Sequence, residues 1–318
     1  MHYDVFNGDA DGIISLLQLR LAEPKESTLI TGVKRDIALL TSLQCQADDS
    51  LTVLDISMEK NKASLEAILA TGAQVFYADH HKSGDIPQHS NLDAHICLDA
   101  NTCTALIVDE LLQGRFHLWA ITAAYGDNLI AKADELADRA GLTDEQKEQL
   151  KELGILINYN GYGAELADLH FDPALLFEHL LAYNDPFAVI ADPNSAYHTL
   201  TSAYQSDLDK ALAIEASHQS DVLAVFELPN QASSRRISGV YGNWLANQSP
   251  DCAHAVLSEN ADGSYTVSLR APLNNKQGAG DICSQFATGG GRAAAAGINS
   301  LDRAQVGVFI ATVEAYYA

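Results

Sequence analysis

The sequence predicts an α/β fold, with an N-terminal, doubly wound and mostly parallel sheet followed by a second, smaller α/β domain. Short apolar runs alternate with helix-length segments through the first half of the chain. Several of these runs end in acidic or imidazole side chains, at the strand end where parallel sheets bind ligands. The length of 318 residues also exceeds what one hydrophobic core usually supports.

The first domain is predicted to contain five strands separated by helices. The candidate strands are Tyr3–Phe6, Thr28–Thr31, Leu51–Ile56, Gln74–Ala78 and His95–Leu98. The candidate helices are Gly12–Ala22, Lys60–Ala70, Thr102–Leu112, His117–Leu136, Thr143–Leu153 and Pro173–Tyr183. The polar, aromatic stretch from Asn158 to Gly163 is interpreted as a structural loop.

A change of pattern near residue 185 marks the expected domain boundary. Turn signals occur at Asn184-Asp185-Pro186 and at Asp192-Pro193-Asn194, and a polar helix is expected from about Leu200 to Ser217. We therefore predict a first domain over residues 1–185, a linker over 186–221 and a second domain over 222–318.

The second domain mixes short strands with glycine-rich connections. Its candidate strands are Val225–Leu228, Ile237–Val240, Ala253–Ser258 and Tyr265–Arg270, with a short helix at Asn243–Asn247. A glycine-rich loop, Gly289-Gly290-Gly291, is expected to precede an alanine-rich helix or turn.

The charge balance limits the partners that the protein can bind. Lys and Arg number 19 against 42 acids, which gives a formal net charge of −23. Such a field repels long polyanions, whose binding depends on many contacts between basic side chains and phosphates. We expect no long nucleic acid as a partner, whereas a small phosphorylated ligand in a local positive pocket remains compatible.

Cysteine usage and hydropathy indicate a reduced protein outside the membrane. The five cysteines are widely spaced without a C-x-x-C pair, which argues against a disulfide framework or a structural zinc site. No apolar run approaches the roughly 20 residues that span a bilayer, and no signal peptide is visible. We expect a cytoplasmic protein with no membrane partner, and a homodimer stays open.

Two acids flank the turn after the first strand, in Asn7-Gly8-Asp9-Ala10-Asp11-Gly12. Two carboxylates this close repel each other unless a cation neutralises them or one takes up a proton. Asp11 could instead cap the helix expected from Gly12, which leaves Asp9 unexplained. Metal binding and capping both stay open from this turn alone. Residues Asn101 to Thr104 are expected to cap the helix that follows them.

Further candidate ligands follow other strands. Asp55 ends one apolar run, and Asp79-His80-His81 ends the next. Asp127 lies in a helical stretch and could be a final ligand or an exposed helix acid. Carboxylates with imidazole at one sheet edge favour Mn²⁺ or a related ion, and the absence of thiolates argues against structural zinc.

These residues resemble the four motifs of the DHH phosphoesterases in order and approximate spacing. The motifs correspond to Asp9-x-Asp11-Gly12, Asp55, Asp79-His80-His81 and Gly126-Asp127. The run Gly289-Gly290-Gly291-Arg292, continued by Ala295-Ala296-Gly297, resembles the substrate-binding signature of the DHH-associated C-terminal domain. Together these motifs span almost the whole chain.

The resemblance implies a phosphodiesterase with two ions, usually Mn²⁺, with Mg²⁺ and Co²⁺ as alternatives. By that analogy Asp9 and Asp55 hold one ion, and a second set with Asp55 as the shared ligand holds the other. That second set is Asp11, Asp55, His80 and Asp127. His81 would contact the scissile phosphate or assist the leaving group, and Asp79 would orient a histidine.

The sequence departs from the family pattern twice. The family usually begins its first motif with a histidine ligand, where this chain has Asn7, and an amide oxygen is a weaker ligand. The glycine-rich loop usually carries histidine where this chain has Arg292, and arginine can hold a phosphate with two hydrogen bonds. The resemblance places another substrate-binding arginine at Arg270.

The implied activity is hydrolysis of very short 5′-phosphorylated oligonucleotides to 5′-mononucleotides. Because the chain shows no further nucleic-acid-binding domain and is strongly acidic, we expect linear dinucleotides such as pGpG or pApA as substrates. The alternatives are a 3′-phosphoadenosine 5′-phosphate phosphatase, a cyclic-dinucleotide phosphodiesterase and a non-catalytic nucleotide-binding module.

Overall fold

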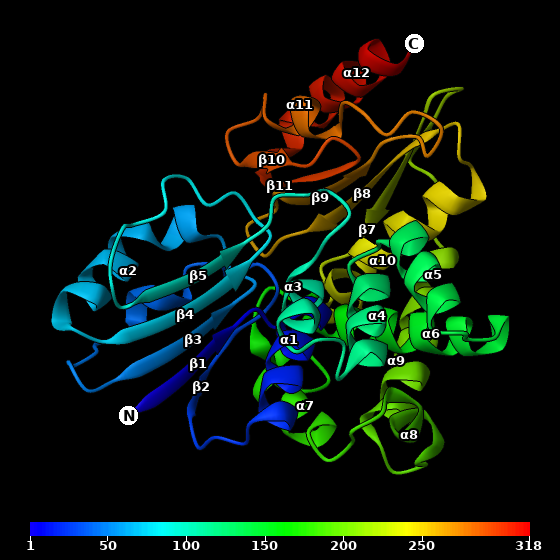
Figure 1. Cartoon of the computed structure of the whole chain (residues 1–318). Helices are drawn as coiled ribbons and strands as arrows, with labels where there is room; N and C mark the ends of the chain where they lie inside the picture. The colour runs from blue at the N-terminus through cyan, green and yellow to red at the C-terminus, as the bar shows by residue number, and fades with distance from the viewer. The chain divides into compact units, whose positions relative to one another are not determined.

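The computed structural model describes all 318 residues, and they form two compact units, Met1–Ser202 and Ala203–Ala318 (Figure 1). The predicted α/β class is confirmed, because one unit contains an all-parallel sheet and the other a mixed sheet. The division falls inside helix α9 (Ala196–Leu212), within the segment predicted as a linker.

The first unit is built on five parallel strands in the order β2-β1-β3-β4-β5. They are β1 (His2–Phe6), β2 (Thr28–Ile30), β3 (Ser50–Leu54), β4 (Gln74–Asp79) and β5 (Leu92–Ile96). Strand β2 lies on one side of β1, whereas β3, β4 and β5 follow on the other side. The connection that leaves β1 and the connection that leaves β3 therefore run in opposite directions along the sheet. Such a switch point leaves a crevice at the carboxyl ends of these two strands.

Helices cover both faces of this sheet (Figure 1). On one face α2 (Met58–Thr71) buries Leu65 and Leu69 against Val53 and Tyr77. On the other lie α1 (Ala10–Ala22), α3 (Thr104–Leu111) and α4 (His117–Gly126). The remaining helices of this unit are α5 (Ile130–Arg139), α6 (Asp144–Gly161), α7 (Pro173–Leu180) and α8 (Pro186–Ala191).

The single helix predicted over His117–Leu136 is wrong, because the chain forms two helices there. Helix α4 ends at Gly126, and Asn128 adopts a left-handed φ of 62° before α5 begins at Ile130. Asparagine tolerates this conformation better than most residues. The break places Asp127 at a helix terminus.

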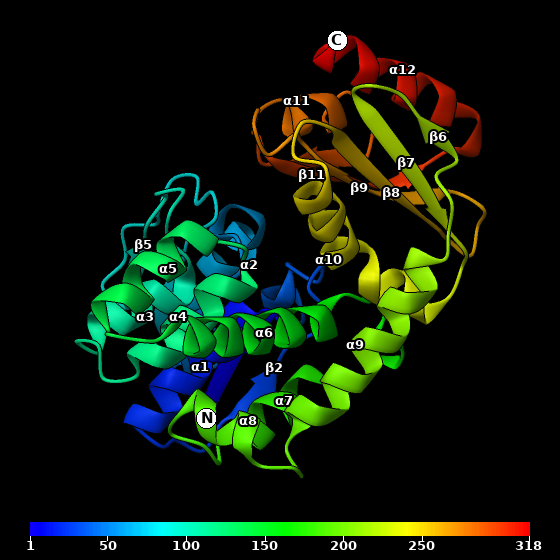
Figure 2. The same ribbon diagram turned by 90° about the vertical axis from the view of Figure 1, so that its right-hand side faces the viewer.

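The predicted loop over Asn158–Gly163 is also wrong over its first four residues, which complete α6. Gly154 in α6 fits closely against α4, since a Cβ there would lie 2.2 Å from the Thr122 carbonyl oxygen. Helix α6 therefore packs against α4 and continues through the first four of the polar residues that resemble a turn in the sequence. Figure 2 shows α4 and α6 side by side.

The second unit has a six-stranded mixed sheet in the order β10-β11-β9-β8-β7-β6. The strands are β6 (His218–Gln219), β7 (Leu223–Leu228), β8 (Ala253–Glu259), β9 (Tyr265–Arg270), β10 (Gly289–Gly291) and β11 (Ala295–Leu301). Residues of α11 (Ala279–Cys283) and α12 (Val306–Tyr317) join the apolar core on one face of the sheet. No helix of the protein is both long and apolar enough to cross a membrane.

Three predicted elements of this unit are wrong. The expected strand Ile237–Val240 lies inside α10 (Ala232–Gln248), where Ile237, Tyr241 and Leu245 recur at helical spacing. The alanine-rich segment is strand β11, paired with β9 and with β10, so the expected glycine loop is itself a short strand. Pairing with β9 overrides the helical preference of alanine here.

Candidate metal centre

The switch point of the parallel sheet gathers the acids that follow its strands. Asp9 lies in the turn after β1, Asp55 directly follows β3, and Asp79 ends β4 just before His80. Because these strands are parallel neighbours, their carboxyl ends meet at one edge. The four side chains are nearly buried.

The turn after β1 directs two carboxylates to different helix starts. Of the two open alternatives for Asp11, capping of α1 is excluded, since Asp9 is the cap and its Oδ1 accepts the N–H groups of Asp11 (3.0 Å) and Gly12 (3.1 Å). The Asp11 carboxylate instead accepts the N–H groups of Thr104 and Ala105, both at 2.8 Å, at the start of α3. The prediction that residues Asn101 to Thr104 cap the following helix is therefore wrong for their side chains, because α3 has no side-chain cap from this segment. The positive ends of α1 and α3 both point at this site.

Asp55 occupies a strained position at the centre of the site. It is a buried, non-glycine residue with a left-handed φ of 58°, a conformation that usually costs about 1–2 kcal/mol. Thr104 Oγ1 donates a hydrogen bond of 3.1 Å to Asp55 Oδ1. Burial raises the pKa of Asp55 well above its usual value, and the negative charges of Asp11 and other nearby acids raise it further. A cation at this point would relieve that repulsion.

His80 presents a nitrogen to three carboxylates at once. Its Nε2 lies 3.5 Å from Asp55 Oδ1, 3.7 Å from Asp11 Oδ2 and 3.9 Å from Asp127 Oδ2. Its Nδ1 is 3.0 Å from the Thr102 carbonyl oxygen, which can only accept, so Nδ1 donates this hydrogen bond and Nε2 is the nitrogen that can bind a metal.

The donor set of Asp11, Asp55, His80 and Asp127 fits a divalent ion. Ligand atoms about 2.1 Å from one ion lie roughly 3.0–3.5 Å apart, slightly closer than the distances measured here. Oxygen and imidazole donors suit Mn²⁺ and related ions. Cys103, the thiol at the start of α3, is kept neutral because burial raises its pKa well above its usual value.

His81 lies beside this set but is held by a different partner. Its Nδ1 is 2.8 Å from Asp79 Oδ1 and 3.6 Å from Asp55 Oδ1. Donor atoms of Asp55, His80 and His81 lie within 4.8 Å of one another, so a metal could also be held there. We favour the set with Asp11 and Asp127, because the nitrogen of His81 that faces Asp55 already donates to Asp79.

Asp127 is positioned by close contacts of the glycine before it. A Cβ on Gly126 would lie 2.6 Å from Ala10 Cβ and 2.8 Å from the Gly154 carbonyl oxygen. Helix α4 therefore ends tightly against α1 and α6, and the next residue, Asp127, reaches His80. Helix packing thus brings this carboxylate to the strand-end acids.

Lys34 is a site residue that the sequence analysis missed. Its Nζ lies 2.5 Å from Asp9 Oδ2 and 3.0 Å from Asn158 Oδ1. Burial alone would raise the pKa of Asp9, but the Lys34 charge and hydrogen bond lower it to about 2. A sequence signal for Lys34 exists, since it follows β2 at the same sheet edge, where a basic side chain can neutralise a buried acid.

Asn7 also lies at this edge, with its side chain bonded to neighbouring backbone. Its Oδ1 accepts the N–H of Asp9 (3.1 Å), and its Nδ2 donates to the Lys34 carbonyl oxygen (3.0 Å). The amide therefore organises the turn after β1 in the structure.

In the second unit, Arg270 is packed under α10. Its guanidinium donates to Asn243 Oδ1 (2.6 Å), to Ser268 Oγ (3.0 Å) and to the carbonyl oxygen of Gly239 (3.1 Å). Thr266, Ser268 and Arg270 share one face of β9, as strand alternation predicts.

The glycine-rich segment lies at the edge of that sheet. A Cβ on Gly289 would lie 1.9 Å from the Cys283 carbonyl oxygen, and Gly291 has a φ of 146°. Both glycines are therefore needed for the backbone path, whereas Gly290 faces open space. Arg292 is exposed in the turn between β10 and β11.

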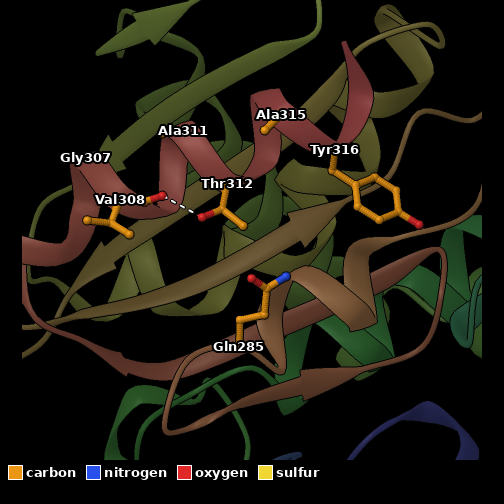
Figure 3. Close-up of a pocket in the computed structure, with 7 residues that line it drawn as sticks. All are labelled: Gln285, Gly307, Val308, Ala311, Thr312, Ala315 and Tyr316. Atoms are coloured by element: carbon orange, nitrogen blue, oxygen red, sulfur yellow. Dashed lines mark hydrogen bonds between the residues drawn. The ribbon is translucent and has the colours of Figure 1, made fainter.

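A hollow of about 660 Å³ lies elsewhere in the second unit, between α12 and Gln285 (Figure 3). Besides Gln285 it is lined by Gly307, Val308, Ala311, Thr312, Ala315 and Tyr316. The Thr312 hydroxyl donates back to the Val308 carbonyl oxygen at 2.8 Å. With no charged group in its lining, this hollow does not suit a phosphorylated ligand.

Comparison with known proteins defines the class of fold. No family model matches the sequence, and no curated protein matches it. Exonuclease RecJ bound to manganese matches the structure with a TM-score of 0.61 at 15% identity, covering 99% of this chain and 89% of the other. RecJ from Thermus thermophilus in complex with Mn²⁺ matches with a TM-score of 0.56 at 17% identity, covering 99% and 52%.

The pGpG-specific phosphodiesterase PggH from Vibrio cholerae matches over nearly the full length of both chains. Its TM-score is 0.55 at 15% identity, covering 99% of this chain and 98% of PggH. This protein therefore shares its fold with RecJ and PggH.

Proposed function

We propose that this protein is a metal-dependent phosphodiesterase that hydrolyses very short 5′-phosphorylated oligonucleotides. The observation that carries the proposal is the set of carboxylates around His80 Nε2, with the proton of His80 fixed on Nδ1. Such a set fits Mn²⁺ or Mg²⁺ and lies at the switch point where open α/β sheets bind ligands.

A divalent ion on this set would supply the concentrated positive charge that stabilises a phosphoryl group under attack. The protein contributes orientation and proton transfer. In the hydrolysis, a water oxygen bonds to phosphorus, the bond from phosphorus to the 3′ oxygen breaks, and that oxygen takes up a proton. His81 is our candidate for the proton donor or phosphate contact through Nε2, because Asp79 holds its Nδ1.

The second unit is proposed to carry a phosphate-binding surface of its own. Arg292 is exposed next to Gly290, where an added side chain would meet nothing and a ligand could approach the backbone. Arg270 is our second candidate, and its contacts with Asn243 and Ser268 would fix the guanidinium in one orientation.

Linear dinucleotides such as pGpG or pApA are the substrates we favour. The net charge of −23 disfavours a long polyanion, which would need many basic contacts along its length. The likeness to PggH along both whole chains supports the same choice. The products would be two 5′-mononucleotides.

A substrate panel with added Mn²⁺ tests the proposal. We expect the full chain to hydrolyse pGpG or pApA at least about 10-fold more efficiently than a 20-nucleotide strand, because repulsion grows with the number of phosphates. Cyclic dinucleotides and 3′-phosphoadenosine 5′-phosphate complete the panel. Mononucleotide release, measured by chromatography, gives kcat/KM for each substrate.

Two variants serve as matched controls for the panel. His80→Ala is expected to lose both Mn²⁺ binding and turnover, whereas His81→Ala is expected to lose turnover and retain Mn²⁺. A preference for a cyclic dinucleotide or 3′-phosphoadenosine 5′-phosphate would replace the proposed substrate. Nucleotide binding without any turnover in Mn²⁺ would refute the enzyme and favour a binding module.

A further inference from the structure

The acids at the sheet edge divide into two groups with different neighbours. Asp11, Asp55 and Asp127 surround His80 Nε2 at 3.5–3.9 Å. Asp9 interacts with Asp55 but also faces Lys34, and its two oxygens already accept three hydrogen bonds from N–H groups. These come from the N–H groups of Asp11 and Gly12 and from the Lys34 ammonium.

Lys34 is held in place both at its backbone and at its side-chain ammonium group. Its backbone N–H donates to the Gly161 carbonyl oxygen at 2.9 Å, and its carbonyl oxygen accepts from Asn7 Nδ2 at 3.0 Å. Its Nζ donates to Asn158 Oδ1 and lies 5.4 Å from the centre of the Tyr162 ring. The lysine is thus tied to the turn after β1 and to the end of α6, rather than extended into solvent.

The environment of Asp9 does not fit a second divalent ion. Asn7 stands where a histidine would be needed as a ligand, and both polar atoms of its amide bond to backbone. Gly161 packs against this turn so closely that a Cβ there would lie 3.3 Å from Asp9 Cβ. A divalent ion on Asp9 would also have to lie beside the Lys34 ammonium, and like charges repel.

We propose that the Lys34 ammonium takes the place of one of the two ions, so that each chain binds a single divalent ion on Asp11, Asp55, His80 and Asp127. The inference deepens the proposed function and rests on its metal site. A lysine ammonium is a compact point charge, so it can neutralise Asp9 and still attract a phosphate oxygen.

Metal stoichiometry of the full chain tests the inference directly. We expect calorimetric titration with Mn²⁺, together with elemental analysis after dialysis, to give one ion per chain. The electron paramagnetic resonance spectrum of bound Mn²⁺ is expected to be that of an isolated ion. Two ions per chain with a spin-coupled spectrum would overturn the inference.

Variants separate the charge of Lys34 from its shape. Lys34→Met combined with Asn7→His is expected to gain a second, spin-coupled Mn²⁺, whereas Lys34→Arg keeps the charge and is expected to stay at one. Lys60→Met, at an exposed position on α2, is the matched control and should stay at one. If the double variant does not fold, the wild-type stoichiometry still decides.

The same samples distinguish failure of the inference from failure of the proposed function. One isolated ion without hydrolysis of any substrate would refute the phosphodiesterase and leave the inference standing. Two coupled ions with hydrolysis would refute the inference and leave the function. Binding of no ion would overturn both.

Discussion

Two buried acids of the first unit, Asp4 and Asp55, differ in the charges that surround them. Burial alone would raise the pKa of Asp4, but hydrogen bonds from Arg20, His2 and Ser27 lower it below the usual range. Arg20 Nε lies 2.8 Å from Asp4 Oδ2, and Arg20 Nη2 contacts Asp4 Oδ1. Asp55 has acids as neighbours instead, and its pKa is raised. Asp4 is satisfied within the protein, whereas Asp55 needs a cation from outside.

This difference predicts a pH-dependent stability for Asp4. Because its pKa is lower in the folded protein than in the unfolded chain, the ionised carboxylate stabilises the fold at neutral pH. That stabilisation should be complete above about pH 5 and disappear as the pH falls through the carboxyl range. Asp4→Asn is expected to lower the free energy of unfolding by about 3–5 kcal/mol at pH 7.

Urea unfolding of the wild type and Asp4→Asn at pH 7, 5 and 3 measures this effect. The difference between the two proteins should shrink toward acid pH. Asp48→Asn, at an exposed acid, is the control and should change little. A difference that stays constant from pH 7 to 3 would contradict the assigned charge of Asp4.

At the scale of helices, the candidate centre depends on how α4 meets α1 and α6. Gly126 and Gly154 allow the backbones to approach, since a Cβ on either glycine would lie within 2.8 Å of a backbone atom of the other helix. Asp127 directly follows this contact and reaches His80 at 3.9 Å. Packing between helices therefore sets the position of a ligand.

Gly126→Ala is expected to disturb both stability and metal affinity. The added methyl group would overlap Ala10 and Gly154, and such overpacking typically costs about 1–3 kcal/mol. Displacing Asp127 should weaken Mn²⁺ binding about 10- to 100-fold, as seen when ligand-supporting contacts are lost. Thermal unfolding and calorimetric titration measure the two effects.

Gly307→Ala is the matched control for this substitution. Gly307 lies in α12 with no atom within 4 Å of the added methyl group, so neither stability nor Mn²⁺ affinity should fall. Unchanged Mn²⁺ affinity in Gly126→Ala would show that Asp127 does not contribute to the centre.

At the scale of the whole molecule, the excess of acids is the dominant electrostatic feature. With 42 acids against 19 basic residues, self-repulsion opposes the compact state at neutral pH. Salt screens this repulsion, because the Debye length falls from about 30 Å at 0.01 M to about 3 Å at 1 M.

The melting temperature should therefore rise by several degrees between low and high NaCl at pH 7. For proteins of 150–250 residues about 1 kcal/mol corresponds to about 2–4 °C. Differential scanning calorimetry measures the shift, and the same series at pH 5 should give a smaller one because part of the acids are protonated. A melting temperature that falls with NaCl would contradict dominant self-repulsion.

The sequence by itself determined the strand framework and the acids at its edge. Strands β1, β3 and β4 are short apolar runs, and the residues after them must meet at one edge because parallel neighbours end together. Asp9, Asp55 and His80 could therefore be predicted to lie close together without a structure. Weak local signals failed in the second unit, where Ile237–Val240 resembles a strand but forms one turn of α10.

The tertiary structure alone decided which partner each acid has. Asp11 accepts from α3 across 93 positions of the sequence, and Asp9 meets Lys34 across 25. No local pattern encodes such contacts, because they depend on how helices and loops pack around the sheet. The same acidic motif can therefore hold a metal ion or an ammonium group, according to whether a lysine reaches it.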